Sequence, residues 1–214
     1  MAHSARPRRW VRPRAKADRM AADGGVKSWD SIRLTEARQV LALMGVDRDE
    51  WPPAALSVAA HYDALRAARH RSAALDYLAH ALPRLEAIGW AARIVEDAAR
   101  HDPPPPRRRQ ALDMALRWLE APSEHHRRAA GDAAAAIPRP VPERLLASAV
   151  FFSGGSIAAP GQAAVPAPDH VAARYVAGAI GATCREAPDP AAAFDAALTL
   201  GEAVAARGLA ALDR

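Results

Sequence analysis

Proline divides this chain into short segments, and it stands where helices are expected to begin. Pro83 and Pro190 each precede a run whose apolar residues recur every three to four positions. Because proline fixes φ and lacks an N–H group, it suits the first turn of an α-helix and interrupts a helix elsewhere. The apolar spacing after Pro83 is helical rather than alternating, with Leu85, Ile88, Ala92 and Val95 on one face. The pattern therefore predicts short helices joined by proline breaks.

The composition favours an all-α fold. Alanine, leucine, arginine and glutamate are good helix formers and are abundant, while aromatic residues make up only 5% of the chain. Thr35, Ser123 and Asp169 are expected to cap helices, and glycine or proline to end them. We expect eight to nine short helices, over residues 34–44, 53–68, 71–82, 84–100, 107–120, 124–136, 143–152, 169–185 and 190–208.

Two arrangements of these helices remain open, a compact bundle and stacked α-α hairpins. The second is favoured by one internal similarity, since residues 73–82 and 110–119 share Ala-Leu-Asp at a spacing of 37 residues. Repeat families normally show at least three copies, and residues 194–200 match only in alanine and leucine. Half of the residues are apolar, so the chain can bury a core, and we expect a single helical domain over residues 30–214.

The net charge of +5 is concentrated near the amino terminus. Residues 1–29 contain eight lysines or arginines against two aspartates, and the remainder is nearly neutral. Because this basic tail has no apolar periodicity, we expect it to be disordered. Three interpretations stay open: a solvated arm, translation that starts at Met20 rather than Met1, or nucleic-acid binding through residues 6–19, where arginines would contact phosphates.

The single cysteine bears on the cellular compartment. Cys184 has no partner in the chain for a disulfide, and no stretch resembles the apolar region of a secretory signal. The longest strongly apolar helical segment, residues 175–184, is far shorter than the roughly 20 residues needed to cross a bilayer. We therefore expect a cytoplasmic protein without a membrane span.

The longest predicted connection is residues 151–170, with the sequence FFSGGSIAAPGQAAVPAPDH. Ser153, Gly154, Gly155 and Ser156 suit the end of the preceding helix, because a glycine can adopt the left-handed conformation and the serines can bind freed backbone groups. The three prolines that follow favour an extended segment. Two interpretations stay open, a strap that covers the body and a docking segment for a partner.

No motif in the chain specifies a reaction. Residues 153–156 lack the Gly-x-Ser-x-Gly spacing of a nucleophile elbow and the Lys-Ser/Thr ending of a phosphate-binding loop. His125 and His126 are adjacent, so on a helix their imidazoles point about 100° apart and cannot both bind one metal ion. Glu124 beside them suits a helix N-terminus. We therefore expect no enzymatic activity, no cofactor and no metal.

Tryptophan and glycine mark positions where helices are expected to meet. Trp90 and Trp118 lie in amphipathic segments and are interpreted as anchors between helices, because basic residues do not alternate with them as in single-strand binders. Gly178 and Gly181 each cost about 1 kcal/mol relative to alanine inside a helix. We expect a close helix crossing, or contact with residues 153–169, to offset that cost, which puts this helix near the centre.

Three stretches carry a resemblance to a known family: LAHALPRLEAIGWAAR at residues 78–93, ALRWLEAPSEHHRRAAGDAA at 115–134, and ASAVFFSGGSIAAP at 147–160, followed by VAARYVAGAIGA. Over residues 55–208 the chain resembles an uncharacterised bacterial helical family, a domain of unknown function. We associate that family with gene neighbourhoods of type VI secretion systems. The resemblance implies a cytoplasmic accessory or adaptor that helps to load or assemble a secretion apparatus, and it implies no catalytic residues.

From these observations we expect a non-enzymatic interaction protein that binds a protein partner through a helical surface. The predicted contact residues are Ser153, Gly154, Gly155, Ser156 and Trp90. The alternative is a nucleic-acid-associated protein that acts through the arginines of the basic tail.

Overall fold

A computed structural model describes residues 28–213, and within that range the chain forms helices and no β-strands. This confirms the all-α prediction for the described residues. The tail predicted to be disordered is residues 1–29, of which 1–27 lie outside the described residues, while Trp29 packs on Tyr62 with 5.2 Å between ring centres and so belongs to the body. Over residues 28–213 no helix combines the length and apolarity needed to cross a membrane. The helices are α1 (Ala37–Met44), α2 (Val58–Ala67), α3 (Arg71–Ala81), α4 (Arg84–His101), α5 (Pro106–Glu120), α6 (Glu124–Ala135), α7 (Pro142–Phe151), α8 (Asp169–Glu186) and α9 (Pro190–Arg207), with 3₁₀ turns η2 (Arg48–Glu50) and η3 (Gly208–Leu212).

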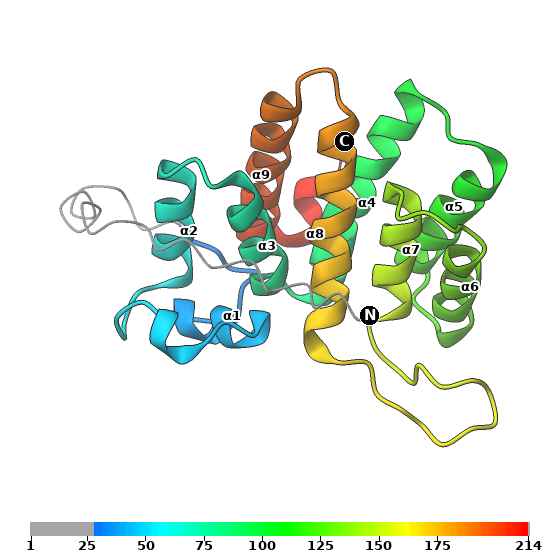
Figure 1. Cartoon of the computed structure of the whole chain (residues 1–214), viewed down its shortest axis with the longest axis horizontal. Coiled ribbons are helices and arrows are strands. Elements are labelled where there is room, and N and C mark those ends of the chain that lie inside the picture. Colours follow the sequence, from blue (N-terminus) through cyan, green and yellow to red (C-terminus); the bar gives the residue numbers. More distant parts are fainter. Residues whose placement is uncertain (1–27, 214) are drawn as a thin grey trace, which may run out of the picture.

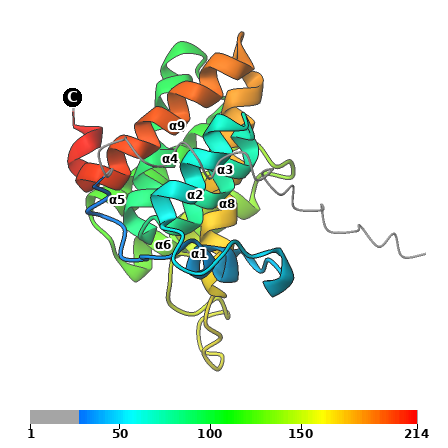
Figure 2. The ribbon, with the colours of Figure 1, turned by 90° about the vertical axis from the view of Figure 1, so that its left-hand side faces the viewer.

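Helix α8 lies at the centre of the arrangement (Figure 1), as the sequence predicted. It packs against α1, α3, α4, α7 and α9, so helices far apart in the sequence meet along its length. Figure 2 shows α9 running across α4 on one side of the molecule. In a stack of hairpin repeats each unit would contact only its neighbours. The described residues therefore form the compact bundle, which is the first of the two expected arrangements.

One cluster of buried apolar side chains extends from α1 to α9. Trp90 of α4 is 0% exposed, and its indole N–H donates a hydrogen bond of 2.9 Å to the carbonyl of Ala197 in α9. Trp118 of α5 is also buried. The interpretation of Trp90 as an anchor between helices is confirmed, and that of Trp118 stays a prediction. The single domain over residues 30–214 stays a prediction.

A close helix crossing occurs at a glycine that the sequence did not single out. A Cβ on Gly201 of α9 would lie 2.6 Å from the ring of Trp90, so α9 and α4 can approach only where a side chain is missing. Gly178 has ordinary room, because a Cβ there would lie 3.6 Å from the nearest leucine of α7. A Cβ on Gly181 would lie 3.1 Å from a flexible arginine of its own helix. Gly178 packs on α7 at ordinary van der Waals distance, so the expectation that a close crossing or a contact with residues 153–169 offsets the cost of these glycines stays a prediction.

Two helices begin later than the sequence predicted, because side chains other than the expected ones cap them. Helix α2 begins at Val58 rather than near residue 53, since the Ser57 hydroxyl accepts a hydrogen bond from the third residue of the helix. Helix α1 begins at Ala37 rather than at residue 34. Its N-cap is Glu36, not Thr35, and Glu36 forms a capping box with the third residue of the helix.

Candidate functional site

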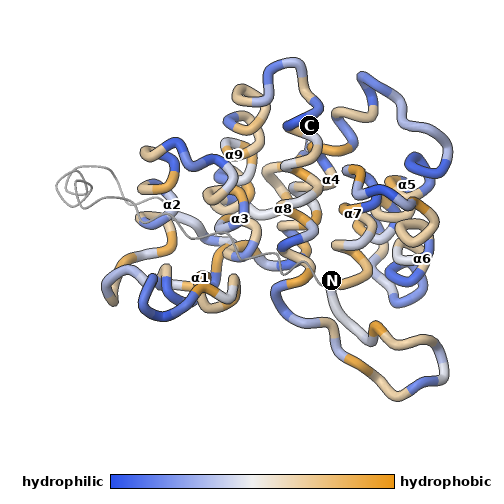
Figure 3. The backbone as a smooth tube through the Cα atoms, in the orientation of Figure 1, coloured by the Kyte–Doolittle hydropathy of each residue, from blue (hydrophilic) through white to orange (hydrophobic). Residues whose placement is uncertain are grey.

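Residues 152–168, called the loop below, connect α7 to α8 and project beyond the bundle (Figures 1 and 2). The loop contains no charged side chain, although 25% of the residues in the chain are charged. Along much of its length Figure 3 shows pale to orange colours. Residues 159–166 are all exposed, so the loop does not lie across the body as a covering strap. Of the two interpretations from the sequence, the covering strap does not fit residues 159–166, and the docking segment stays a prediction.

The loop folds back on itself as a short hairpin. The N–H of Ile157 donates a hydrogen bond of 2.8 Å to the carbonyl of Val165, and Ser156 forms an antiparallel bridge with Pro166. The Ser156 hydroxyl accepts hydrogen bonds from the N–H groups of Ala158 and Val165, each over 3.1 Å. One serine side chain therefore ties together the two arms of the hairpin.

The tip of the hairpin is a tight turn at residues 159–162. Pro160 occupies its second position, and Gly161 occupies its third with φ of 83°. The N–H of Gln162 donates to the carbonyl of Ala159 over 3.1 Å. This is the pattern of a type II turn, whose third residue needs a positive φ. The tip therefore has a defined geometry that follows from its Pro-Gly pair.

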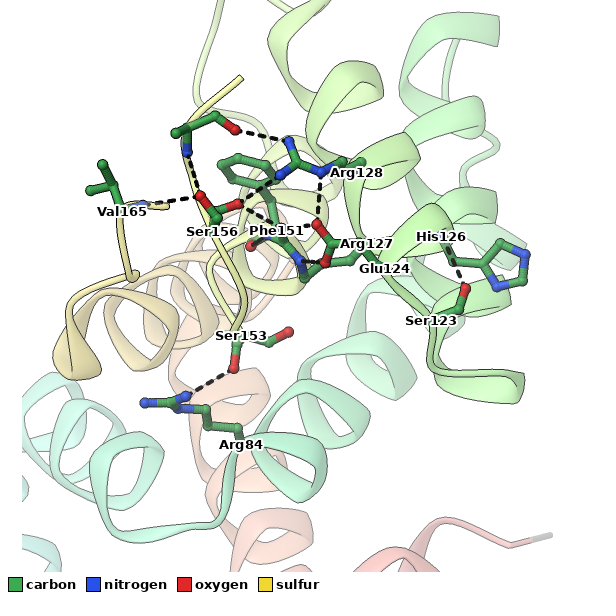
Figure 4. Close-up of polar contacts among 11 residues, drawn as sticks. Arg84, Ser123, Glu124, His126, Arg127, Arg128, Phe151, Ser153, Ser156 and Val165 are labelled. Atoms are coloured by element: carbon green, nitrogen blue, oxygen red, sulfur yellow. Dashed lines mark hydrogen bonds and ion pairs between the residues drawn. The ribbon is translucent and has the colours of Figure 1, made fainter. Parts of the chain in front are cut away.

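Arg127 of α6 holds the base of the hairpin (Figure 4). It is only 4% exposed, and its guanidinium donates to the backbone carbonyls of Phe151 and Ser156, the second over 2.8 Å. It also forms two bonds with the carboxylate of Glu124, at 2.7 and 2.8 Å, and lies 5.0 Å from the centre of the Phe151 ring. A buried guanidinium needs such partners. Two of these partners are backbone carbonyls, that of Phe151 at the end of α7 and that of Ser156 in the loop.

Arg128 adds a second set of bonds at the same place. It donates to the carbonyls of Ser156 and Ala158, each over 3.1 Å, and to Glu124 over 2.7 Å. Hydrogen bonds from Arg127 first, and then from Arg128, lower the pKa of the Glu124 carboxyl to about 2, so it is ionised at neutral pH. We call Glu124, Arg127 and Arg128 the arginine clamp. The clamp fixes three carbonyls of the α7–loop junction without using any loop side chain.

The four predicted contact residues of the loop lie at its base rather than at its exposed tip. Ser153 offers its carbonyl to Arg84, which donates over 3.0 Å. Gly155, not Gly154, has the left-handed conformation, with φ of 63°, and a Cβ there would lie 3.0 Å from a carboxylate oxygen of the clamp. Gly154 has open space around it. Ser156 is the residue that both clamp arginines bind, so these residues shape the loop.

The fifth predicted contact residue is not part of this site. Trp90 is completely buried, bonds from α4 to α9 and has no exposed surface for a partner. The sequence did not indicate that Arg127 and Arg128 hold the loop, because residues 123–128 have the pattern of an exposed, polar helix start. The available signal was that Arg127 precedes Ala130 by three positions and so shares its buried face.

A hollow of about 460 Å³ lies at the other end of α8, between the C-terminal ends of α4 and α8 and the N-terminal parts of α5, α7 and α9. Arg108 and the buried Glu143 form a two-bonded ion pair in its wall, at 2.8 and 3.1 Å. Burial raises the pKa of the Cys184 thiol to about 11, so this thiol is protonated at neutral pH. Among residues 28–213 no three metal-binding side chains are grouped to hold an ion. The expected lack of enzymatic activity stays a prediction.

Comparison with known proteins gives a match to a protein family. Residues 61–205 match the model of a family of unknown function (DUF6931). The match begins within α2, ends within α9, and includes both the loop and the arginine clamp. No curated protein and no solved structure matches the chain. The expected membership of a domain family of unknown function is confirmed.

Proposed function

Because the chain belongs to the DUF6931 family, whose function is unknown, we propose a function from its geometry: a non-enzymatic interaction protein whose loop binds a protein partner. One observation carries this proposal. The uncharged loop, residues 152–168, is exposed over residues 159–166 and is held at its base by the arginine clamp. An element that is ordered before binding loses less conformational entropy when it binds, so such an arrangement favours docking.

The chemistry of the loop suits a protein surface better than a nucleic acid. Val165 is 47% exposed, more than the two other exposed large apolar side chains of the described residues, which are each 38% exposed. Alanines and prolines surround it. Nucleic acids are bound chiefly through positive charges that contact phosphates, and the loop carries none. An apolar groove on a partner is the surface that this hairpin complements.

We further propose that the partner belongs to the assembly or loading of a type VI secretion apparatus in the cytoplasm. The support for the pathway is the resemblance of residues 78–93, 115–134 and 147–160 to a helical family associated with those gene neighbourhoods. The support for the compartment is the single cysteine, which cannot form a disulfide within the chain. The pathway and the docking element are separable proposals.

Affinity purification from the native host, followed by mass spectrometry, tests both parts. The tagged full chain is compared with Ala164→Asp in the loop and with Ala54→Asp, which adds the same charge to another exposed loop. We expect one defined protein partner with the unchanged chain and with Ala54→Asp, and its loss with Ala164→Asp. A partner that both variants retain, or both lose, contradicts docking through the loop. A partner from outside the secretion apparatus overturns the pathway alone.

A second candidate function rests on the charge of the basic tail. Residues 1–29 carry a net charge of +6, whereas the remainder of the chain is nearly neutral. An arginine-rich arm binds phosphates in a salt-dependent manner. The test is the same purification with a chain that lacks residues 1–26. Nucleic acid that co-purifies with the full chain at low salt, and disappears with the truncation, would favour this function over docking.

A further inference from the structure

The hollow of about 460 Å³ at the far end of α8 from the loop combines an apolar wall with acidic side chains. Aliphatic residues of α4 and α9 make up much of the wall, among them Ile94, Val95 and Leu200. Four carboxylates, one imidazole and one guanidinium also line the hollow. Its volume lies within the range of roughly 300 to 1,000 Å³ that is typical of ligand pockets. A complementary occupant is therefore apolar at its centre and basic at its edges.

Two of the four carboxylates have no basic partner. Asp97 is paired with arginines of its own helix, and Glu143 is paired with Arg108. Asp102 and Glu186 are exposed, and neither forms an ion pair with a described residue. The pKa of Arg108 is raised by its hydrogen bond to Glu143 and, further, by these two carboxylates, so both lie within electrostatic range of that pair. The mouth of the hollow therefore offers two carboxylates to a basic ligand.

A segment of the same chain has the complementary chemistry. Residues 8–12 have the sequence Arg-Arg-Trp-Val-Arg, in which two apolar residues lie between arginines. Trp10 is the one aromatic residue among residues 1–27, which lie outside the described part of the chain. An apolar cavity of about 150 Å³ in another protein holds benzene. A hollow of about 460 Å³ therefore has room for an indole ring and a neighbouring aliphatic side chain.

The described residues begin close enough to the hollow for this segment to reach it. The N–H of Ser31 donates a hydrogen bond of 3.0 Å to the carbonyl of Ala205 in α9. Ala197, which lines the hollow, lies about 12 Å earlier along the axis of the same helix. The stretch from Trp10 to Ser31 can extend to roughly 70 Å at most. This length is sufficient to pass around α9.

We propose that the hollow binds residues 8–12 of its own chain, called the Trp10 segment below. Trp10 and Val11 pack on the apolar wall, and the flanking arginines meet the carboxylates at the mouth. Burial of the indole ring supplies most of the binding free energy, because an exposed ion pair contributes little. The arginines select this segment over a neutral one and make the contact sensitive to salt.

This contact would regulate the basic tail. Arginines held at the hollow are not available to phosphates, so docking here competes with nucleic-acid binding by residues 6–19. The inference does not rest on docking through the loop, because residues 152–168 do not line the hollow. A failure of the loop proposal therefore leaves it unchanged.

The test is NMR of the ¹⁵N-labelled full chain, in which the unchanged chain is compared with Trp10→Ala. We expect shifts at the amides of the hollow, measured at Ala98, Ala187 and Ala193. The matched control is Met20→Ala, which removes an apolar side chain from the same tail outside the Trp10 segment and should leave these amides unchanged. Circular dichroism checks that all three chains have the same helix content.

A synthetic peptide of residues 5–15 tests the charges. Added to the full-length Trp10→Ala chain, it should shift the same amides in a saturable manner. A further Glu186→Gln should weaken its binding about threefold, as expected for one exposed ion pair. Glu120→Gln replaces an exposed carboxylate at the other end of α5, outside the lining, and should leave the affinity unchanged.

Four results would overturn the proposal. The first is that Trp10→Ala leaves the amides of the hollow unchanged, and the second is that Met20→Ala shifts them equally. The third is that Glu186→Gln and Glu120→Gln weaken the peptide equally. The fourth is that the peptide does not bind at about 1 mM, near the effective concentration of a tethered segment. If the peptide binds while Trp10→Ala causes no shift, the occupant is a basic segment of another protein.

Discussion

Two regions of the bundle bury ionisable side chains. The regions differ in the charges and hydrogen bonds that surround these side chains. In the arginine clamp, Arg127 is 4% exposed and bonds to Glu124 and to two carbonyls. In the pair formed by His61 of α2 and Tyr77 of α3, the ring centres lie 4.8 Å apart, and the Tyr77 hydroxyl has no hydrogen-bond partner among the described residues. Burial lowers the pKa of His61 to about 4 and raises that of Tyr77, so both are neutral at pH 7.

The difference follows from what each side chain can do with its proton. Arginine stays protonated in proteins, so its burial requires permanent acceptors. The acceptors of Arg127 include carbonyls of the α7–loop junction, which means that the buried charge and the ordered loop depend on each other. Histidine and tyrosine can be buried as neutral groups, so their burial does not require a counter-charge. The clamp thus organises an exposed element, whereas the His61–Tyr77 pair belongs to the core.

The largest expected effect is that of Arg127→Met, which removes the buried charge and frees both carbonyls. We expect the free energy of unfolding to fall by about 3 kcal/mol, near the lower end for breaking a buried ion pair, because Glu124 is half exposed and regains water. Urea unfolding followed by circular dichroism measures this. Arg128→Met is the matched control, since the Arg128 side chain is 27% exposed, and should cost about 1 kcal/mol. If both variants lost the same free energy of unfolding, burial of Arg127 would not account for its larger expected contribution.

The second prediction concerns pH and the His61–Tyr77 pair. The pKa of His61 in the folded chain is about 4, below its ordinary value of 6.5. Between these values the unfolded chain binds a proton that the folded chain does not, so stability falls as the pH drops from 6.5 to 4, by up to about 3 kcal/mol. Urea unfolding at pH 7, 5.5 and 4 tests this. His61→Leu should flatten the profile within that window, and an unchanged slope would contradict the assignment to His61.

The clamp should respond to acid in a lower pH window. The pKa of Glu124 is about 2 in the folded chain against an ordinary value of 4.5, so its contribution is complete above 4.5 and is lost as the pH falls towards 2. Because the Glu124 side chain is 55% exposed, solvent screening limits the effect of Glu124→Gln to about 1 kcal/mol at pH 7. The free energies of unfolding of this variant and of the unchanged chain should become equal near pH 2. A constant difference down to that pH would show that charge is not the cause.

The smallest effect is local to the hairpin. Ser156→Ala removes the hydroxyl that accepts from Ala158 and Val165, and it should leave global stability within about 0.5 kcal/mol. Hydrogen exchange at those two amides should accelerate by roughly tenfold, because each loses a hydrogen-bond partner. Ser153→Ala is the control, because Arg84 binds the backbone carbonyl of Ser153, which the substitution keeps. Equal changes in the exchange rates of both variants would contradict the role of the Ser156 hydroxyl in tying the two arms of the hairpin.

The helical body could be predicted from the sequence, because its signals are local. Pro190 marks the start of α9, and the Ser123 hydroxyl caps α6 by accepting from the N–H three residues later. The Pro-Gly pair at residues 160–161 likewise carries the signal of the type II turn. The spacing of Arg127 and Ala130 indicates a shared face, but the partners that make burial of Arg127 tolerable have no local signal, because they are carbonyls 24 and 29 residues further along the chain. The role of Gly201 depends in the same way on where α9 crosses α4.

The closure of the hairpin at Ile157 and Val165 has a consequence for its length. The two arms meet above the clamp, so residues inserted between Gly161 and Gln162 would lengthen only the tip and leave the bundle unchanged. The entropic cost of a longer flexible loop grows slowly, by about 0.6 kcal/mol for each doubling. Evolution can therefore vary the reach and the sequence of the tip while two arginines hold the same junction, and an epitope tag or fluorescent peptide can be inserted there by the same route.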